Sequence, residues 1–416
     1  MAEFDLITLP NGIRLVHKQV ASTKIAHVGI MLDVGSRDES PDQLGIAHFW
    51  EHMAFKGTKK RKSFHILNRL DSLGGELNAY TTKEKICFYA SVLDLHLEKA
   101  LELLTDITFN STFPEKQIEK ERNVILEEMS MYKDNPEDAI MDDFDEVVFT
   151  KHPLGHNILG TQETVGGFSQ SDFKRFLEEN LDSERMVVST VGNFSLQKIE
   201  RLVRKHLNDS PTFSSSKQRK LFGPYRPSSL SEVKPITQAQ CAIGRPAYKI
   251  ADERRIPFFM LANILGGPGM NSRLNMSLRE KFGYVYSIDA NYNPYVDTGL
   301  FSVFFGTDPR HISRSFQLIR KEFAMLRERK LGEVQFHKAR EQLMGQLAMS
   351  EENNGSMMLM MAKSLLDMGS VPSLENVFRD IRKITREHII ELANEMLVDD
   401  DMSTLVFVPE NGKVNH

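Results

Sequence analysis

The chain has 416 residues, of which 41% are hydrophobic and 26% charged, and its formal net charge is −5. This balance is ordinary for a globular protein with two domains of about 200 residues each, and it argues against nucleic acid or an anionic membrane as a partner. No apolar run approaches the ~20 residues that a membrane-spanning helix needs. Residues 1–12 lack the basic and apolar regions of a signal peptide, so we expect a cytoplasmic protein.

The first 131 residues show a succession of expected strands and helices. Short apolar stretches separated by turn residues predict extended segments within residues 1–40. Residues 44–72 and 95–131 have helical patterns, with a break at 110–114 before a long charged helix. Between these two regions, the segment "GGELNAYTTKEKICFYASVL" predicts a β-hairpin.

A change in composition follows the first 210 residues. Residues 211–231 contain three prolines and little periodicity, which is typical of an interdomain linker. Beyond this linker the order of expected elements recurs. A helical pattern covers residues 261–283, a strand pair covers 284–306, and a further helix begins at 311.

Two blocks of sequence in the two halves match in pattern. "HLEKALELLTDI" begins at His96, and "HISRSFQLIRKEFAML" begins at His311, roughly 215 residues later. We therefore expect a duplicated fold, with one domain over 1–210 and a homologous domain over 232–416. Strands and helices that do not strictly alternate favour the α+β class, in which helices pack on a largely antiparallel sheet in each domain.

The chain has two cysteines, Cys87 and Cys241, which lie in different halves of the sequence. Neither belongs to a metal-binding or redox motif. We therefore expect two free thiols, as in a protein from a reducing compartment.

The stretch "GIAHFWEHMAFKGT" contains two histidines four residues apart. On a helix His48 and His52 point the same way, and Glu51 lies beside them. Imidazole ligands with a neighbouring carboxylate base are the minimum for activating water on zinc. The alternative is a pair of histidines on a partly buried helix face. The corresponding stretch of the second half, "NILGGPGM", has no histidine pair, so the duplicated fold does not require this cluster.

A third ligand is expected on the long charged helix. Its sequence "PEKQIEKERNVILEEMSMY" carries apolar residues and two acids on one stripe, formed by Ile118, Glu121, Ile125 and Glu128. A carboxylate on an inward stripe is costly unless it is paired or bound to a cation. Glu128 or Glu121 is therefore a candidate ligand, and the other acid a supporting residue, whereas Glu127 is expected to face solvent. The alternative is a solvated charged helix.

The motif "HFWEHMAFKGT", followed 76 residues after His52 by a glutamate in "NVILEEM", resembles the inverted H-x-x-E-H motif of the pitrilysin family. This zinc metallopeptidase family includes insulysin and the mitochondrial processing peptidases, and the resemblance covers nearly the whole chain as a short two-domain type. It implies one zinc ion per chain in the first domain, bound by His48, His52 and Glu128. It also implies that Glu51 is the general base and that Glu121 supports the ligands.

The segment "GGELNAYT" is a candidate substrate-binding strand. Gly75 precedes a short strand that carries Asn78 and Ala79, and an exposed strand of this kind can pair with a peptide. The alternative is an ordinary hairpin start. Resemblance to the family favours binding, because its corresponding edge strand holds the substrate backbone.

The segment "LGGPGMNSRL" is glycine-rich but lacks the G-K-[ST] sequence of a phosphate-binding loop. It is similar to the loop of the non-catalytic subunit of the mitochondrial processing peptidases, which is implicated in admitting substrate. The resemblance implies that Gly266, Gly267 and Gly269 contact substrate in the second domain. The alternative is a turn that ends a helix.

The segment "LREKFGYVYS" contains Arg279 and, seven residues later, Tyr286. In the family, an arginine and a tyrosine with this spacing approach the substrate carbonyl, and Tyr284 is a competing candidate. Insulysin-like enzymes resemble four such domains in one chain, and their fourth domain supplies this pair. For a two-domain chain, the resemblance implies a homodimer that encloses a chamber.

The expected function is that of a zinc endopeptidase that cleaves peptides or unfolded segments bound as an extended strand. Three alternatives remain. The chain could be a non-catalytic family member, the catalytic subunit of a heterodimer with a different partner chain, or a metal-storage or metal-sensing protein. The complete ligand set weighs against the first, and the combination of zinc motif with glycine-rich loop favours self-association over the second. The expected general base, Glu51, beside a metal site with an open coordination position weighs against a metal-storage or metal-sensing protein.

Overall fold

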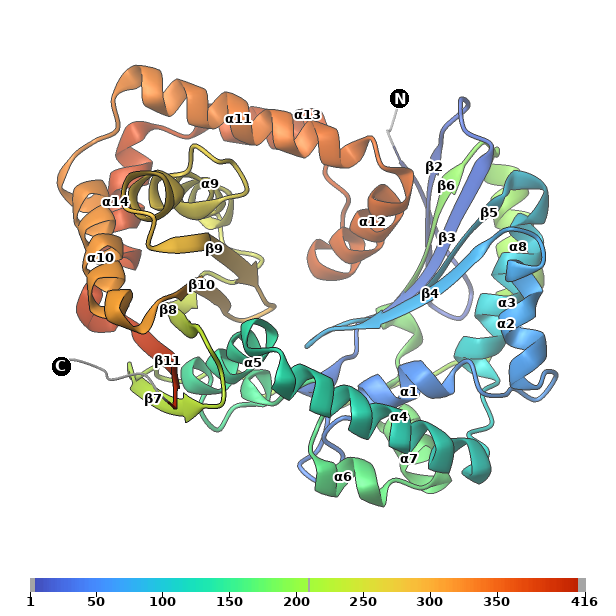
Figure 1. The fold of residues 1–416 in the computed structure, drawn as a ribbon. Helices are drawn as coiled ribbons and strands as arrows, with labels where there is room; N and C mark the ends of the chain where they lie inside the picture. The colour runs from blue at the N-terminus through green and yellow to red at the C-terminus, as the bar shows by residue number, and fades with distance from the viewer. Residues whose placement is uncertain (1–3, 209, 411–416) are drawn as a thin grey trace. The chain divides into compact units, whose positions relative to one another are not determined.

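The computed structural model describes residues 4–208 and 210–410 (Figure 1). Within these residues the chain forms two compact units, each assembled from three segments. Unit 1 consists of residues 4–129, 156–219 without 209, and 349–373. Unit 2 consists of residues 130–155, 220–348 and 374–410.

Unit 1 is built on a mixed sheet with the strand order β1-β2-β6-β3-β5-β4. Its strands are β1 (Asp5–Thr8), β2 (Arg14–Gln19), β3 (Ile25–Leu32), β4 (Glu76–Thr81), β5 (Ile86–Leu93) and β6 (Met186–Gly192). Neighbouring strands are antiparallel except β2 and β6, which are parallel. The interior strand β6 is buried on both faces, whereas β4 forms an edge of the sheet.

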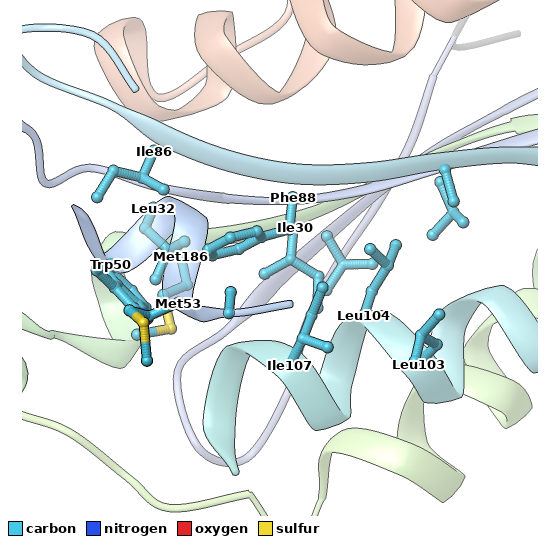
Figure 2. Packing of buried hydrophobic residues seen from close by; sticks show 14 of the residues in the cluster. Ile30, Leu32, Trp50, Met53, Ile86, Phe88, Leu103, Leu104, Ile107 and Met186 are labelled. Carbon is cyan, nitrogen blue, oxygen red and sulfur yellow. The ribbon is translucent and has the colours of Figure 1, made fainter. Parts of the chain in front are cut away.

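Helices cover both faces of this sheet. The helices of unit 1 are α1 (Ile46–Met53), α2 (Ser63–Asp71), α3 (Leu97–Phe109), α4 (Glu115–Asp134), α6 (Gln162–Gly167), α7 (Gln170–Asn180), α8 (Leu196–Leu207) and α12 (Asn354–Met368). On one face, α1 and α3 contribute to a core in which Trp50, Met53, Leu104 and Ile107 pack with strand residues such as Phe88 (Figure 2). The last five residues of α4 already belong to unit 2.

The opposite face of the unit 1 sheet is covered by α12. Its methionines Met357, Met358 and Met361 pack in a separate buried cluster that includes Met31 and Cys87 of the sheet. The sheet and the helix lie close together at Gly29, where a Cβ atom would stand 2.8 Å from the sulfur of Met358. Unit 1 therefore has two cores, one on each face of its sheet.

Unit 2 has a sheet with the strand order β7-β11-β8-β10-β9. Its strands are β7 (Ser229–Lys234), β8 (Ala239–Ala247), β9 (Val285–Pro294), β10 (Gly299–Thr307) and β11 (Ser403–Pro409). Only β7 and β11 are parallel neighbours. The helices are α5 (Pro136–Val148), α9 (Arg255–Gly266), α10 (Ile312–Glu328), α11 (Glu333–Glu351), α13 (Leu374–Lys383) and α14 (Arg386–Met396).

The two sheets match strand by strand. The order β2-β6-β3-β5-β4 in unit 1 corresponds to β7-β11-β8-β10-β9 in unit 2, and the parallel pair lies at the same place in each. A short 3₁₀ turn ending in a histidine precedes both α3 and α10, at His96 and His311. The predicted α+β class and the predicted duplication are therefore confirmed.

Two helices, one from each half of the sequence, pack on the sheet of the other half. Helix α5 lies in the first half of the sequence, but it packs on β8 and β11 of unit 2. Helix α12 lies in the second half, but it packs on β3 and β6 of unit 1. Grouping by packing thus differs at these segments from the predicted domains over 1–210 and 232–416. The expected linker over 211–231 contains no helix in its described residues, and its last three residues begin β7.

Two of the helical predictions were too long. The segment 44–72 contains α1 and α2, separated by residues 54–62, where Gly57 has a positive φ of 155° and pairs with Lys62 as a bridge. The segment 261–283 contains the end of α9, an irregular loop and a π-helix over Asn275–Lys281. Both interruptions contain glycines, which can adopt backbone conformations that a helix does not allow. Both cysteines are buried free thiols, as predicted.

Candidate metal centre

Helix α1 is fixed at its start by a buried acid. The two carboxyl oxygens of Glu39 accept hydrogen bonds from the backbone N–H groups of Gly45 and Ala47, both at 2.9 Å. These are N–H groups that the first turn of a helix cannot pair internally. Gly45 has a φ of 93°, and a Cβ atom there would collide with the backbone of Leu159. The start of the helix therefore requires both Glu39 and a glycine.

The apolar side of α1 packs into the core through Phe49, Trp50 and Met53, as Figure 2 shows for the last two. This packing leaves His48 and His52 together on another side of the helix. Their ring centroids are 4.7 Å apart. The helical i,i+4 spacing thus becomes a pair of neighbouring imidazoles held by a rigid, well-packed helix.

Glu128 of α4 completes a three-residue group with these histidines. Its carboxylate oxygens lie 3.7 Å from Nε2 of His48 and 3.5 Å from Nε2 of His52. One ligand atom from each of the three residues lies within 4.8 Å of the other two. Burial, and then the neighbouring His52, lowers the pKa of His48 to about 3, which keeps this imidazole neutral as a metal ligand must be. Two imidazoles and a carboxylate are a donor set that suits zinc.

Glu121, one stripe position before Glu128 on α4, contacts the other nitrogen of His52. Its Oε2 lies 3.2 Å from Nδ1, and its Oε1 lies 2.7 Å from the Nζ atom of Lys56. Although burial raises the pKa of Glu121, the hydrogen bonds from His52 and Lys56 outweigh this effect and lower it. An ionised Glu121 fixes the His52 ring with Nε2 turned toward Glu128. Among the described residues, Nδ1 of His48 has no equivalent partner.

Glu51 lies between the two histidines in sequence and is held by a neighbouring strand. The hydroxyl of Thr81, at the end of β4, donates a 2.6 Å hydrogen bond to Oε2 of Glu51. Burial raises the pKa of Glu51, and the Thr81 hydrogen bond opposes that shift. Such an environment brings a carboxylate closer to the pKa range in which it can both take up and release a proton.

The long helix α4 has the expected faces. Ile118 and Ile125 are buried, Glu121 is buried beside them, and Glu127 is exposed. The structure brings Glu128 to both histidines and Glu121 to one of them. These contacts distinguish the two acids, whereas the helical pattern alone did not show which of them is the candidate ligand. Their roles stay predictions.

Sequence reasoning missed three residues that hold this group in place: Glu39, Lys56 and Thr81. Lys56 is four residues after His52, a spacing that could have been noticed. Thr81 closes the quoted segment "GGELNAYT", but its partner Glu51 is 30 residues away. Local patterns do not reveal such a contact.

The candidate substrate residues of unit 1 lie on or next to β4. This strand pairs with β5 on one side and forms the end of the sheet on the other. Asn78 is exposed and Ala79 is half-buried. A Cβ atom at Gly75 would lie 2.6 Å from a methyl group of Val92, so the close approach of the chain requires glycine there.

Arg279 and Tyr286 lie in unit 2 and contact each other. The guanidinium carbon of Arg279, on the π-helix, lies 5.5 Å from the ring centroid of Tyr286, whose side chain is 82% exposed. Tyr284, the competing candidate, instead stacks on His311 with ring centroids 4.2 Å apart. Of these two tyrosines, Tyr286 is therefore the one available to a ligand.

Close packing within unit 2 requires glycine at three positions, at the end of α9 and in the loop that follows it. A Cβ atom at Gly266 would lie 2.7 Å from the backbone nitrogen of Ala290, and one at Gly267 would collide with Asn263. A Cβ atom at Gly269 would collide with Gln342. The packing of the loop thus accounts for these three glycines, and their contact with substrate stays a prediction.

The fold and the clustered side chains define a two-unit α+β protein with a histidine–histidine–glutamate group that has the composition of a metal site, the one such group among the described residues. Residues 14–162 match the family described as insulinase (peptidase family M16). Residues 167–343 match the domain described as peptidase M16 inactive domain. The chain therefore belongs to peptidase family M16, and the resemblance found in the sequence is confirmed.

Relatives agree with this family, and solved structures share the fold. The chain is 31% identical over 402 residues to the uncharacterized zinc protease YmxG of Bacillus subtilis, covering 96% of this chain and 97% of that protein. It is 34% identical to an uncharacterized zinc protease of Streptomyces coelicolor, covering 94% and 86%. A protease from Helicobacter pylori has the same fold, with a TM-score of 0.90 at 21% identity over 98% of this chain and all of that one.

A second solved structure, described as a peptidase M16 inactive domain from Pseudomonas fluorescens, matches with a TM-score of 0.91 at 18% identity. It covers 99% of this chain and 98% of that one. Among the described residues, no helix combines the length and apolar character needed to cross a membrane.

Proposed function

We propose that this protein is a zinc-dependent endopeptidase that cleaves peptides or unfolded segments. The observation that carries the proposal is the convergence of His48, His52 and Glu128. The carboxylate of Glu51 lies on α1, the short helix that carries both histidines. The names of the relatives, which are called zinc proteases, support the choice of metal. One zinc ion per chain is expected, because the described residues offer one such group.

The mechanism assigns separate tasks to these side chains. Zinc, when held by the two histidines and Glu128, supplies Lewis acidity that lowers the pKa of a water and polarises a peptide carbonyl. Glu51 takes a proton from the attacking water and later passes it to the leaving amine. The hydrogen bond from Thr81 occupies Oε2 of Glu51 and leaves Oε1 for the proton. Glu121 orients His52 throughout.

The substrate is proposed to bind as an extended strand along β4. An unpaired edge of a sheet offers backbone N–H and C=O groups to a peptide, and exposed Asn78 can add a side-chain contact. A folded protein presents such an extended segment only after local unfolding. Peptides and unfolded segments are therefore the expected substrates.

The proposed function is tested by removing the metal. The purified chain is expected to contain one zinc per chain and to hydrolyse an internally quenched, unstructured peptide. Chelation should abolish hydrolysis, and added zinc should restore it. Metal analysis and peptide fluorescence, measured on the same samples, check this. Stoichiometric zinc with no hydrolysis of any peptide in a broad library would instead favour a non-catalytic member or a subunit that needs a different partner.

We further propose that Arg279 and Tyr286 stabilise the reacting carbonyl in the other chain of a homodimer. The support is the exposure of Tyr286, the Arg279 contact that orients its ring, and the family layout in which this pair is supplied by another domain. A hydroxyl aimed at a developing oxyanion acts chiefly on the transition state. In a two-fold dimer each chain would be both donor and acceptor.

Mixing two inactive variants tests the shared site. Glu51→Gln chains and Tyr286→Phe chains are each expected to be nearly inactive. After verified subunit exchange, about half of the dimers are mixed and each has one intact site, so activity should recover to roughly a quarter of the wild-type value. An exchanged mixture that stays inactive would contradict action in trans.

A further inference from the structure

Unit 2 contains a pocket of about 530 Å³ beside the π-helix, a volume within the usual range for ligand sites. One wall is formed by the segment that runs from Asn271 to Phe282, and another by the α10 residues from Arg314 to Met325. A smaller pocket of about 120 Å³ shares three lining residues with it, Asn271, Arg273 and Gln335. Both pockets therefore border the glycine-rich loop.

The pocket is cationic although the whole chain carries a net charge of −5. Four basic residues line it, against one acid, Glu322. That acid is already paired, because the guanidinium of Arg273 contacts its Oε2 atom at 2.8 and 2.9 Å. Lys281, Arg314 and Lys321 are exposed, and among the described residues none of them has a carboxylate partner. Arg314 donates a hydrogen bond to the neutral amide of Gln317, and the Nζ atom of Lys281 lies over the ring of Phe282. The surplus charge is thus local and uncompensated.

The unpaired cations are spread along the pocket. Arg314 and Lys321 lie seven residues apart on one side of α10, which places them roughly 10 Å apart, about the length of three extended residues. Lys281 lies on the other wall, at the end of the π-helix. This spacing suits several single charges along a strand better than one compact ion.

The other lining residues also favour a peptide. Leu318 and Met325 of α10 and Phe282 of the facing wall place apolar surface between the cations. The glycine-rich loop that borders the pocket lacks a phosphate-binding sequence. An extended peptide with acidic side chains among apolar ones complements both the separated cations and the apolar surface between them.

We infer that this pocket binds acidic side chains of the peptide substrate and makes the enzyme prefer acidic segments. The inference rests on the proposed function, which it deepens by naming a substrate class. The pocket adjoins the two segments of unit 2 that are proposed to contact substrate, since Asn271 belongs to the glycine-rich loop and Lys281 follows Arg279 on the π-helix. Recognition would be electrostatic and would weaken as ionic strength rises.

Binding of two matched peptides tests the inference. Fluorescein-labelled, unstructured peptides of one length, with glutamate or glutamine at alternate positions, are titrated with the zinc-loaded full-length Glu51→Gln chain. Fluorescence anisotropy should show about fivefold to tenfold tighter binding of the glutamate peptide, because two exposed ion pairs contribute on this scale. The added pair of substitutions Arg314→Gln and Lys321→Gln should remove the preference. The matched pair Arg226→Gln and Lys249→Gln removes equal charge from exposed sites of unit 2 outside the pocket and should keep it.

Other outcomes overturn the inference. Equal binding of the two peptides would do so, as would a preference that survives loss of Arg314 and Lys321 in a variant with unchanged circular dichroism. Binding of sodium tripolyphosphate that depends on these two residues, without preference for the glutamate peptide, would assign the pocket to phosphates instead.

Hydrolysis of the two peptides by the wild-type chain keeps the two proposals separate. If neither peptide is cleaved but the binding preference depends on Arg314 and Lys321, the proposed function fails and the pocket assignment stands. If both are cleaved with equal kcat/KM and bind equally, the pocket assignment fails and the peptidase stands.

Discussion

The Glu51→Gln variant is expected to keep one zinc per chain and to lose peptide hydrolysis by a factor of about 10² to 10⁴. Glutamine has the same shape and can still accept the hydrogen bond that Thr81 donates, so the packing of α1 should not change. It cannot take up the proton of the attacking water. Metal analysis and single-turnover hydrolysis of a quenched peptide measure the two halves of this expectation.

Glu127→Gln is the matched control for this experiment. Glu127 is an exposed glutamate next to Glu128 on α4, and the same chemical change there should leave zinc content and turnover unaltered. Near-normal turnover in a zinc-loaded Glu51→Gln chain would remove Glu51 from the mechanism. Loss of zinc together with activity would show that Glu51 acts on metal binding instead.

The Glu128→Gln variant is expected to lose zinc, whereas Glu121→Gln should bind it about 10- to 100-fold more weakly. Glu128 contacts the Nε2 atoms of both histidines, so its charge is needed where the metal is bound. Glu121 contacts only Nδ1 of His52, and its loss should leave the ring less firmly oriented. Competition with a chromophoric chelator measures both affinities.

The reverse ranking would show that the third ligand is assigned to the wrong acid. If Glu128→Gln keeps stoichiometric zinc with unchanged affinity while Glu121→Gln loses it, the carboxylate of Glu121 must reach the metal. Lys56→Gln is a useful companion variant, because Lys56 contacts Glu121 but neither histidine nitrogen. It should resemble a mild form of Glu121→Gln.

Helical periodicity was enough to predict much of the metal group from the sequence. It placed His48 and His52 on one side of α1, and it separated the inward Glu128 from the outward Glu127 on α4. A periodic pattern fixes which residues share a face of a helix, but not what lies opposite that face. The choice between Glu121 and Glu128 therefore came from the resemblance to a family, and the contact of each acid with a particular histidine nitrogen came from the structure.

Contacts between distant segments were beyond the sequence patterns. The hydroxyl of Thr81 meets Glu51, and Glu39 holds the start of α1, because the sheet and loops bring these segments together. The packing of α5 and α12 was missed for the same reason. An apolar helix face shows that a helix covers something, without showing which sheet it covers.

Each of the helices α5 and α12 packs on the sheet of the other half of the sequence, and this has a consequence for the synthesis of this protein on the ribosome. The N-terminal sheet cannot be covered on its second face until residues 354–368 have emerged, because α12 provides that cover. The hydrogen bond from Arg14 to the carbonyl of Leu365, for example, spans 351 residues of sequence. Until then the apolar surface formed by residues such as Met31 and Cys87 stays open to water and to other nascent chains. Neither half of the gene therefore encodes a product that can complete its own fold, and Glu128, the proposed third metal ligand, lies just before the point where the chain passes into unit 2.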